Sequence, residues 1–201
     1  LPYDQTNAFS PITVAYLAGA PELRPFIAFP PTAEGIRKAV EDRKKFPTDR
    51  KLLVEVLKEQ YSPLQSHEQV GRNIETLLSP DTFTVTTAHQ PNLFTGPLYF
   101  IYKILHAIRL SAFLKTELPE YHFVPVYYMG SEDADFAELN HTYVNGKKIE
   151  WKKEQSGAVG RMLVDKTLVA LIDELEGQLG VEAHGSEVIR LLRDCYASGK
   201  D

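Results

Sequence analysis

The order strand, helix, strand between residues 82 and 129 constrains the fold of this chain more than any other feature. Residues 82–88 are dense in β-branched side chains and predict a buried strand, and residues 121–129 predict a second one. Between them, residues 97–115 predict a helix that begins at Pro97. Strands joined by a helix in this way form a βαβ unit, so we expect an α/β fold with a parallel sheet.

The helix over residues 97–115 carries apolar side chains at steps of three and four. Such spacing predicts a single apolar stripe that packs on the core. The stripe consists of Leu98, Ile101, Leu105, Ile108 and Ala112.

The first 80 residues have a different character from the βαβ unit. Residues 1–31 are rich in proline and aromatic residues, so they predict an arm of short helical turns packed on a core. Residues 32–45, 49–61 and 66–78 each begin near a capping residue and carry apolar positions at helical spacing, which predicts three helices. We therefore expect residues 1–80 to form a proline-rich arm and helices that pack on a core made by residues 81–201.

A small β-hairpin is expected after the βαβ unit. Asn145-Gly146 lies between two short β-forming segments, and this dipeptide readily adopts the positive φ angles of a type I′ turn. We place this hairpin insertion near residues 141–163, with Trp151 packed against it. Two core strands and a hairpin leave the edges of a parallel sheet open, so we expect the chain to be a piece of a longer protein.

Two helices are expected at the end of the chain. Asp165 can cap a helix that runs to about Leu179, and Ser186 can cap another that runs to about Ala197. Cys195 lies among apolar residues of the last helix, which indicates a core position rather than a nucleophile.

Composition and charge exclude several classes of protein. The 22 Lys and Arg residues against 27 Asp and Glu give a net charge of −5, without the basic excess of a protein that neutralises many phosphates. One cysteine allows neither an internal disulfide nor a multi-cysteine zinc site, which fits a reducing cytoplasm. Apolar stretches fall short of the ~20 residues of a membrane helix. Residues 1–10 lack the pattern of a secretory signal. We expect a cytoplasmic protein that binds neither nucleic acid nor membrane.

The loop after the first predicted strand carries polar residues at a helix start. The N-terminus of a helix presents unpaired backbone N–H groups and the positive end of the helix dipole, which together favour a phosphate or carboxylate. The loop matches neither a Walker loop nor a GxGxxG motif. In the alternative interpretation, Asn92 and Thr95 only cap the turn, His89 is structural and Lys103 is a solvated charge. The candidate binding residues are His89, Gln90, Asn92, Thr95, Gly96, Tyr99 and Lys103.

The second candidate segment follows the second predicted strand and holds four carboxylates within residues 131–138. Asp133 and Asp135 could bind a divalent cation. Carboxylates held close together also tend to raise one pKa, which suits a general base. In the alternative interpretation, the acids complement the dipole of a helix whose N-cap is Ser131.

Together, the two segments resemble the cysteine-adding enzyme (BshC) family of bacillithiol biosynthesis. The resemblance rests on residues 89–103, HQPNLFTGPLYFIYK, and residues 124–138, VPVYYMGSEDADFAE, in this order and at this distance. It matches the amino-terminal part of the family, and it implies a Rossmann-like core and, in the full-length protein, a coiled coil that pairs two subunits in a homodimer. Family members often have His where this chain has Ala134, so any role of that His is absent here or taken by another residue.

The resemblance also implies a function and a set of site residues. The family joins cysteine to the amine of glucosaminyl-malate, so the chain is expected to be a ligase that forms a C–N bond. The implied catalytic residues are His89, Glu132, Asp133 and Asp135, with Asp133 placed to accept the amine proton. The implied substrate- or nucleotide-binding residues are Gln90, Asn92, Thr95, Gly96, Tyr99, Lys103 and Ser131. The activating cofactor stays open between ATP, another nucleotide and a divalent cation, and no metal ligand is assigned.

Two other functions remain open. Asp133-Ala134-Asp135 could be the DxD-type metal site of a nucleotide or nucleotide-sugar transferase, although this leaves the His89 loop without a role. The chain could also be a non-catalytic binding domain. A more distant resemblance links the His89 loop to nucleotidyl transferases, in which such a loop meets the phosphates of ATP.

Overall fold

The computed structural model describes residues 1–64, 66–154, 156–197 and 199. The chain divides into two compact units that each combine two stretches of sequence. The first unit consists of Leu1–Val85 and Arg109–Pro125, and the second unit consists of Thr86–Ile108 and Val126–Asp201. Both strands and the helix of the βαβ unit run through this division, so each unit holds a part of all three.

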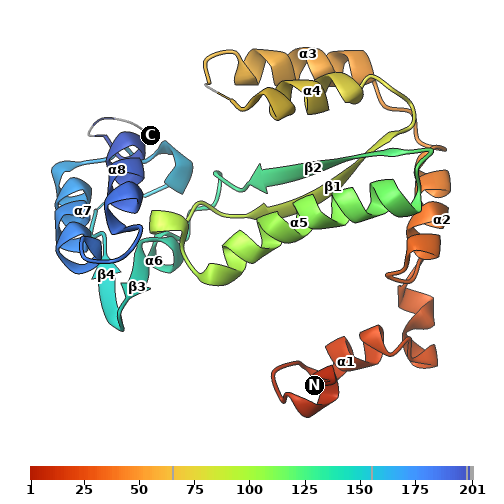
Figure 1. Ribbon diagram of the computed structural model, residues 1–201, viewed down its shortest axis with the longest axis horizontal. Coiled ribbons are helices and arrows are strands. Elements are labelled where there is room, and N and C mark those ends of the chain that lie inside the picture. The colour runs from red at the N-terminus through yellow and green to blue at the C-terminus, as the bar shows by residue number, and fades with distance from the viewer. Residues whose placement is uncertain (65, 155, 198, 200–201) are drawn as a thin grey trace. The chain divides into compact units, whose positions relative to one another are not determined.

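The βαβ unit is confirmed. It consists of β1 (Thr82–His89), α5 (Leu98–Glu117) and β2 (His122–Met129), and β1 and β2 form a two-stranded sheet (Figure 1). The backbone N–H of His122 donates to Asp81 O at 2.9 Å, and that of Gly130 donates to His89 O at 2.9 Å. Both bonds join residues with the same separation along the chain, as parallel pairing requires.

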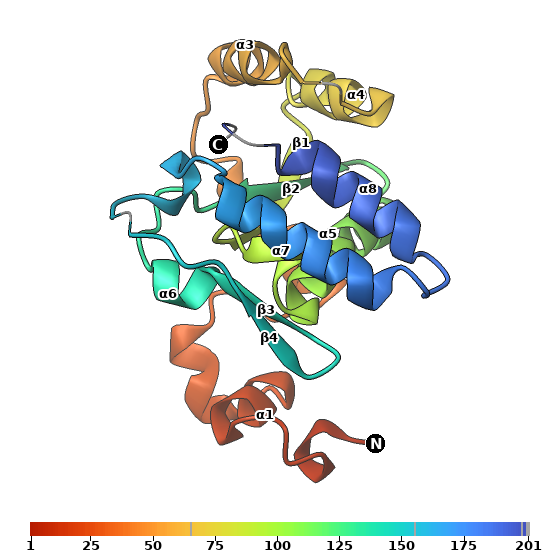
Figure 2. The ribbon, with the colours of Figure 1, turned by 90° about the vertical axis from the view of Figure 1, so that its left-hand side faces the viewer.

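The first unit is mainly helical. Its helices are α2 (Ala33–Arg43), α3 (Arg50–Tyr61) and α4 (Glu68–Thr76), and α3 lies side by side with α4 in both views (Figures 1 and 2). Thr32 and Asp49 cap the first two helices at their expected starts, whereas His67 caps the third, one residue after the expected start at residue 66. A core of Val40, Leu114, Leu118 and Tyr121 joins α2 to the second half of α5 and the start of β2.

The proline-rich arm contains only short helices. These are the 3₁₀ helix η1 (Tyr3–Gln5), the helix α1 (Pro11–Leu17) and the 3₁₀ helix η2 (Pro21–Phe26). Pro11 and Pro21 stand at helix starts, where a missing N–H costs nothing, while Pro25 lies inside η2. None of these three helices contains a buried residue.

The second unit packs a hairpin against two helices. Strands β3 (His141–Val144) and β4 (Lys147–Glu150) pair antiparallel, and Asn145 (φ 50°) and Gly146 (φ 78°) make the expected turn between them. The helices α7 (Lys166–Leu179) and α8 (Gly185–Cys195) lie side by side (Figures 1 and 2). The buried core of this unit consists of Leu93, Phe94, Ile149, Trp151, Met162, Val164, Leu168, Ile172, Leu175 and Ile189.

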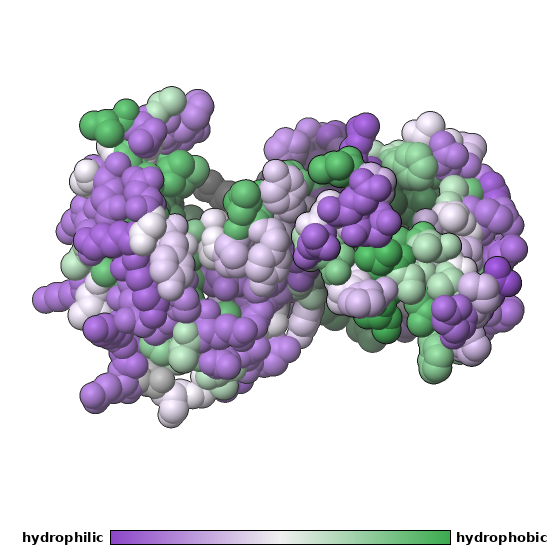
Figure 3. Space-filling model, turned by 90° about the horizontal axis from the view of Figure 1, so that it is seen from below, coloured by the Kyte–Doolittle hydropathy of each residue, from purple (hydrophilic) through white to green (hydrophobic). Residues whose placement is uncertain are grey.

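The expected apolar stripe of α5 is wrong, because the opposite face of the helix is the buried one. Ala107, Ser111, Leu114 and Leu118 recur at steps of four, three and four, and all are buried. Leu105, from the expected stripe, is 54% exposed. Both faces of α5 are apolar, so periodicity could not choose between them. Figure 3 shows apolar residues at the surface on the face that it presents. None of the described helices is long and apolar enough to cross a membrane.

The end of the chain differs from expectation in two respects. Helix α8 begins at Gly185 after His184, one residue before the expected cap Ser186. Gly185 is buried, and a Cβ there would lie 1.6 Å from Leu179 O, so the chain can turn this tightly only at glycine. Cys195 is exposed rather than in the core, because α8 buries Ile189 on its other side.

Candidate functional site

The loop after β1 is anchored by one buried aromatic side chain. The 3₁₀ helix η3 (Leu93–Thr95) places Leu93 and Phe94 in the core of the second unit. The backbone N–H of Phe94 donates to Tyr196 Oη at 3.1 Å, and the two rings pack edge to face with centroids 5.2 Å apart. Burial raises the pKa of Tyr196, so its hydroxyl stays protonated and the anchor stays uncharged. The loop is therefore anchored to the core of the second unit.

Three successive residues of this loop have positive φ angles. Phe94 has φ 50°, Thr95 has φ 68° and Gly96 has φ 57° with ψ −147°. Positive φ is unfavourable for a β-branched residue such as Thr95, and the Gly96 conformation is open almost only to glycine. A Cβ on Gly96 would lie 2.5 Å from Asn92 Cβ. The tight loop carries the chain from Asn92 to the start of α5 at Leu98.

His89 is held at the end of β1 by two side chains of the same motif. Asn92 Nδ2 lies 2.8 Å from His89 Nδ1, and Tyr99 Oη lies 2.6 Å from His89 Nε2. Nδ1 also lies 3.1 Å from the carbonyl oxygen of Gln90, so both ring nitrogens have partners within the same motif. Phe100 packs edge to face on the ring, at 5.6 Å between centroids. These contacts hold the His89 ring in one orientation.

A cleft of about 620 Å³ opens beside His89 within the second unit. Six of the seven candidate residues of the His89 loop line it. Its other wall is formed by α6 (Phe136–Leu139) and β3, and Gln90 Nε2 donates across to Glu138 Oε2 at 3.2 Å. The described lining consists of His89, Gln90, Asn92, Thr95, Gly96, Pro97, Leu98, Tyr99, Ile101, Glu138, Leu139, His141, Thr142 and Tyr143.

Lys103 is the candidate of this loop that lies outside the described lining. Its Nζ donates to Ala88 O, in β1, at 2.5 Å. The side chain is half-buried along the strand. In this conformation the ammonium group stabilises the end of β1 instead of pointing into the cleft.

The acidic segment follows β2 at the same edge of the sheet. Gly130 N donates to His89 O at 2.9 Å, and Tyr127 Oη donates to the same oxygen at 3.2 Å. The two polar segments therefore begin side by side, although Ser131, Glu132, Asp133 and Asp135 lie outside the described lining of the cleft.

The carboxylates of the acidic segment bond to nearby groups. Tyr128 Oη donates to Glu132 Oε1 at 3.1 Å, which raises the pKa of Tyr128. Asp133 Oδ1 accepts from Asp135 N at 2.8 Å, and Asp135 Oδ1 accepts from Glu138 N at 3.2 Å. Asp135 is therefore the N-cap of α6.

The interpretation of Ser131 as a helix N-cap is wrong, because the helix begins five residues later, at Phe136. Ser131 instead meets the 3₁₀ helix η4 (Val159–Arg161), whose Gly160 N donates to Ser131 O at 3.0 Å. A Cβ on Gly160 would lie 2.5 Å from Ser131 Cβ, so the close approach depends on glycine.

The acidic segment does not form a ready metal site. Among the described residues, no group of three or more His, Cys, Asp or Glu side chains is placed to hold a metal ion. One oxygen each of Asp133 and Asp135 already accepts a backbone N–H of the turn before α6. The described residues by themselves therefore do not complete a metal site, and we derive no step through a metal.

Glu138, His141 and Tyr143 line the cleft but were not among the candidate site residues. Glu138 could have been found, since it belongs to the same acidic segment. His141 and Tyr143 could not have been found from the sequence. They line the cleft because the short α6 turns the chain so that β3 contacts η3.

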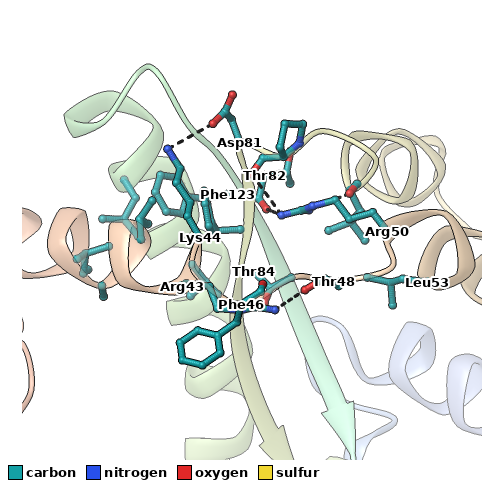
Figure 4. A pocket seen from close by; sticks show the side chains of 18 of the residues that line it. Arg43, Lys44, Phe46, Thr48, Arg50, Leu53, Asp81, Thr82, Thr84 and Phe123 are labelled. Atoms are coloured by element: carbon teal, nitrogen blue, oxygen red, sulfur yellow. Dashed lines mark hydrogen bonds and ion pairs between the residues drawn. The ribbon is translucent and has the colours of Figure 1, made fainter.

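A larger cavity, of about 840 Å³, lies in the first unit and contains none of the candidate residues (Figure 4). Its cationic side chains bond to the protein itself. Arg50 donates to the carbonyls of Leu77, Pro80 and Thr82, and Lys44 Nζ lies 3.5 Å from Asp81 Oδ1. These groups hold the connections around β1, so we place the candidate site in the second unit.

Comparison with known proteins agrees with this geometry. Residues 1–201 match the sequence model of the family described as "Bacillithiol biosynthesis BshC, N-terminal Rossmann-like domain". Three relatives are named BshC cysteine ligases. The chain is 41% identical over 197 residues to that of Flavobacterium psychrophilum, covering 96% of this chain and 37% of the relative. For Cytophaga hutchinsonii the identity is 49% over 156 residues, 78% of this chain and 30% of the relative. For Christiangramia forsetii the identity is 40% over 199 residues, which cover 98% of this chain and 37% of the relative.

Two of these matches cover nearly the whole chain, and the chain spans about a third of the length of the curated relatives. The matched description also agrees with the parallel βαβ unit seen in the structure. The chain therefore belongs to the bacillithiol biosynthesis BshC family and corresponds to its N-terminal Rossmann-like domain.

Proposed function

We propose that this chain contributes the substrate cleft of a cysteine ligase that joins cysteine to the amine of glucosaminyl-malate in bacillithiol biosynthesis. The observation that carries the proposal is the cleft beside His89, at the carboxyl end of β1 in the βαβ unit, in a chain of the BshC family. Ligands of open α/β sheets bind at this edge. The relatives named cysteine ligases support the reaction class.

The reaction sets clear demands on the site. Forming a C–N bond between a carboxylate and an amine expels a carboxyl oxygen, so the cysteine carboxyl needs activation. A nucleotide such as ATP would supply that activation. Leu98 and Tyr99, in the first turn of α5, line the cleft, so a phosphate or an activated carboxyl there would meet the positive end of a 20-residue helix. This part of the site fits an anionic group.

His89 is the residue that we propose to move a proton at the reacting amine. Histidine exchanges protons near neutral pH, and catalytic proton transfer requires a fixed orientation. Asn92 and Tyr99 supply that orientation through bonds of 2.8 and 2.6 Å to the two ring nitrogens. Gln90, Thr95 and Gly96 complete the wall that binds substrate. The roles expected of Lys103, Ser131, Glu132, Asp133 and Asp135 stay predictions.

The test replaces His89 by alanine in the intact protein. General acid–base catalysis typically contributes a factor of about 100 to 10,000, so the rate of cysteine addition should fall by that amount. His89 is half-buried at a strand end, and its loss should leave the melting temperature nearly unchanged. His122→Ala, at an exposed position at the start of β2, is the matched control. Normal melting together with full restoration of bacillithiol in a strain lacking the enzyme would remove His89 from the mechanism.

The same proposal includes the partners and the location. Cysteine and glucosaminyl-malate are the proposed small-molecule partners, and a homodimer is the proposed state of the intact protein, as the family resemblance implies. The single Cys195 agrees with a reducing cytoplasm. Light scattering of the intact protein at micromolar concentration measures the oligomeric state, and a monomer mass would contradict the dimer.

A further inference from the structure

The cleft beside His89 contains one carboxylate in its described lining, and the proposed reaction has not yet given it a role. This carboxylate belongs to Glu138, whose Oε2 accepts from Gln90 Nε2 at 3.2 Å. The other polar side chains of the lining are imidazoles, amides and hydroxyls. Glu138 is thus the source of negative charge in this lining.

The charge of Glu138 is not matched by a cation of the protein. Within the part of the chain that the structure describes, its carboxylate bonds to Gln90 and pairs with no Lys or Arg, and the side chain is exposed. Gln90 is a neutral donor that contacts only one of the two carboxylate oxygens. A cationic ligand group would therefore gain a charge-assisted hydrogen bond, which is about twice as strong as a neutral one.

The acidic neighbours of Glu138 are engaged in local bonds. Glu132 accepts from Tyr128 Oη, and the carboxylates of Asp133 and Asp135 accept backbone N–H groups that hold the turn before α6. Asp135 in turn binds the backbone N–H of Glu138 and fixes where α6 begins. Asp135 therefore helps to position Glu138 at the wall of the cleft.

The surroundings of Glu138 suit a hydroxylated ring. Tyr99 and Tyr143 line the cleft with exposed rings, 53% and 64% accessible, and aromatic rings offer large apolar faces to a ligand. Asn92 and Thr142 add groups that can donate and accept hydrogen bonds. The volume of about 620 Å³ falls within the roughly 300–1,000 Å³ of small-molecule pockets, enough for a sugar-sized ligand.

We infer that Glu138 is a specificity-determining residue, whose carboxylate binds the ammonium group of an amino sugar held in the cleft. The inference rests on the proposed function, in which the amine of this sugar is the group that acquires the cysteine. Binding through Glu138 brings this amine beside Gln90 and toward His89, the residue proposed to move its proton. A sugar with a hydroxyl in place of the amine could donate a hydrogen bond to Glu138 but would form no ion pair with it.

The experiment compares two ligands of the intact protein by titration calorimetry. Glucosaminyl-malate carries the amine, and glucosyl-malate has a hydroxyl in its place. A hydrogen bond to a charged group corresponds to roughly 10- to 100-fold in affinity, so the wild type should prefer the amine by about that factor. Glu138→Gln should reduce the preference to within a few fold. Glu55→Gln, at an exposed position on α3, is the matched control and should retain it.

Two outcomes overturn the inference. One is an unchanged preference in Glu138→Gln. The other is loss of the preference in Asp133→Asn but not in Glu138→Gln, which would assign the amine to Asp133. If Glu138→Gln does not fold, the pH series of the wild type decides, because the preference must fall as the ammonium group loses its proton. A preference that stays constant through that titration also overturns the inference.

Failure of this inference is distinguishable from failure of the proposed function. If the wild type binds glucosaminyl-malate and adds cysteine to it, but Glu138→Gln discriminates equally well, only the role of Glu138 is wrong. If the wild type binds neither ligand and forms no product, the proposed ligase is wrong and the role of Glu138 is lost with it.

Discussion

Replacing Asp165 by alanine should destabilise the second unit, because one carboxylate oxygen organises the start of α7. Asp165 Oδ1 accepts from the backbone N–H groups of Thr167 and Leu168 at 3.0 Å each, and from Thr167 Oγ1 at 2.6 Å. It also accepts from Nε1 of the buried Trp151 at 3.1 Å. Lys153 Nζ lies 3.6 Å from the other carboxylate oxygen. The substitution removes all of these interactions.

The size of the effect follows from the pKa of Asp165. Burial raises this pKa, but the hydrogen bonds from Thr167, Leu168 and Trp151 and the charge of Lys153 outweigh burial and lower it from 3.8 to about 2. At ~1.4 kcal/mol per unit, the shift sets an upper bound of roughly 2.4 kcal/mol. The side chain is 36% exposed, so solvent screening reduces the expected loss to about 1–2 kcal/mol. Loss of an N-cap costs a similar ~0.5–2 kcal/mol.

The effect must also depend on pH. The pKa of the folded state lies below that of the unfolded state, so the stabilisation is fully present above pH ~4 and is lost as the pH falls to ~2. Urea unfolding followed by circular dichroism should show Asp165→Ala about 1–2 kcal/mol less stable than wild type at pH 7, with a smaller difference near pH 2.5.

The control for this experiment is Asp4→Ala, at an exposed position of the arm, which should have no effect at either pH. An equal destabilisation by Asp165→Ala at both pH values would refute the linkage, and none at pH 7 would refute the cap. If the wild type unfolds in acid, a carboxyl titration by NMR above that point still reports whether Asp165 remains ionised at pH 3.

Two further predictions test the packing of α5 and of the loop before it. Leu114 is 1% exposed and Leu105 is 54% exposed, so Leu114→Ala should cost about 2–5 kcal/mol in urea unfolding and Leu105→Ala less than ~1 kcal/mol. The reverse order would show that the other face of α5 is buried. Gly96→Ala should lower stability by roughly 1–3 kcal/mol, because a Cβ would lie 2.5 Å from Asn92 Cβ at a φ of 57°. Gly177→Ala, inside α7 with nothing within 4 Å of its Cβ, is its control in thermal melts, and equal effects of the two would contradict the strain.

Elements with local signals could be predicted well. The β-branched run of β1, the Asn145-Gly146 turn and the cap Asp165 each act on neighbours within a few residues, so their structures are written in short stretches of sequence. The parallel pairing of β1 with β2 followed from the length of the helix between them. Helix α8 was placed two residues late, with Ser186 instead of His184 before its start, because that start depends on a close contact between Gly185 and Leu179.

The candidate site could be predicted only in part. His89, Asn92 and Tyr99 lie within eleven residues and were recognised as one polar loop, and the structure brings them together. The opposite wall of the cleft was not foreseen. The described lining of that wall takes Glu138 and the start of β3, while Ser131, Glu132, Asp133 and Asp135 lie outside it.

Local sequence therefore settled the βαβ order, the hairpin, most helix starts and the polar loop that carries His89, because capping, turn geometry and strand propensity act over a few residues. Contacts between distant residues settled the rest. Which face of α5 is buried depends on where Val40 and Tyr121 meet Leu114, and the cleft depends on Gln90 reaching Glu138, 48 residues further along the chain. Either face of an apolar helix could be buried, and any of several neighbouring carboxylates could line a cleft, so local sequence does not distinguish between them. Only packing selects one of them.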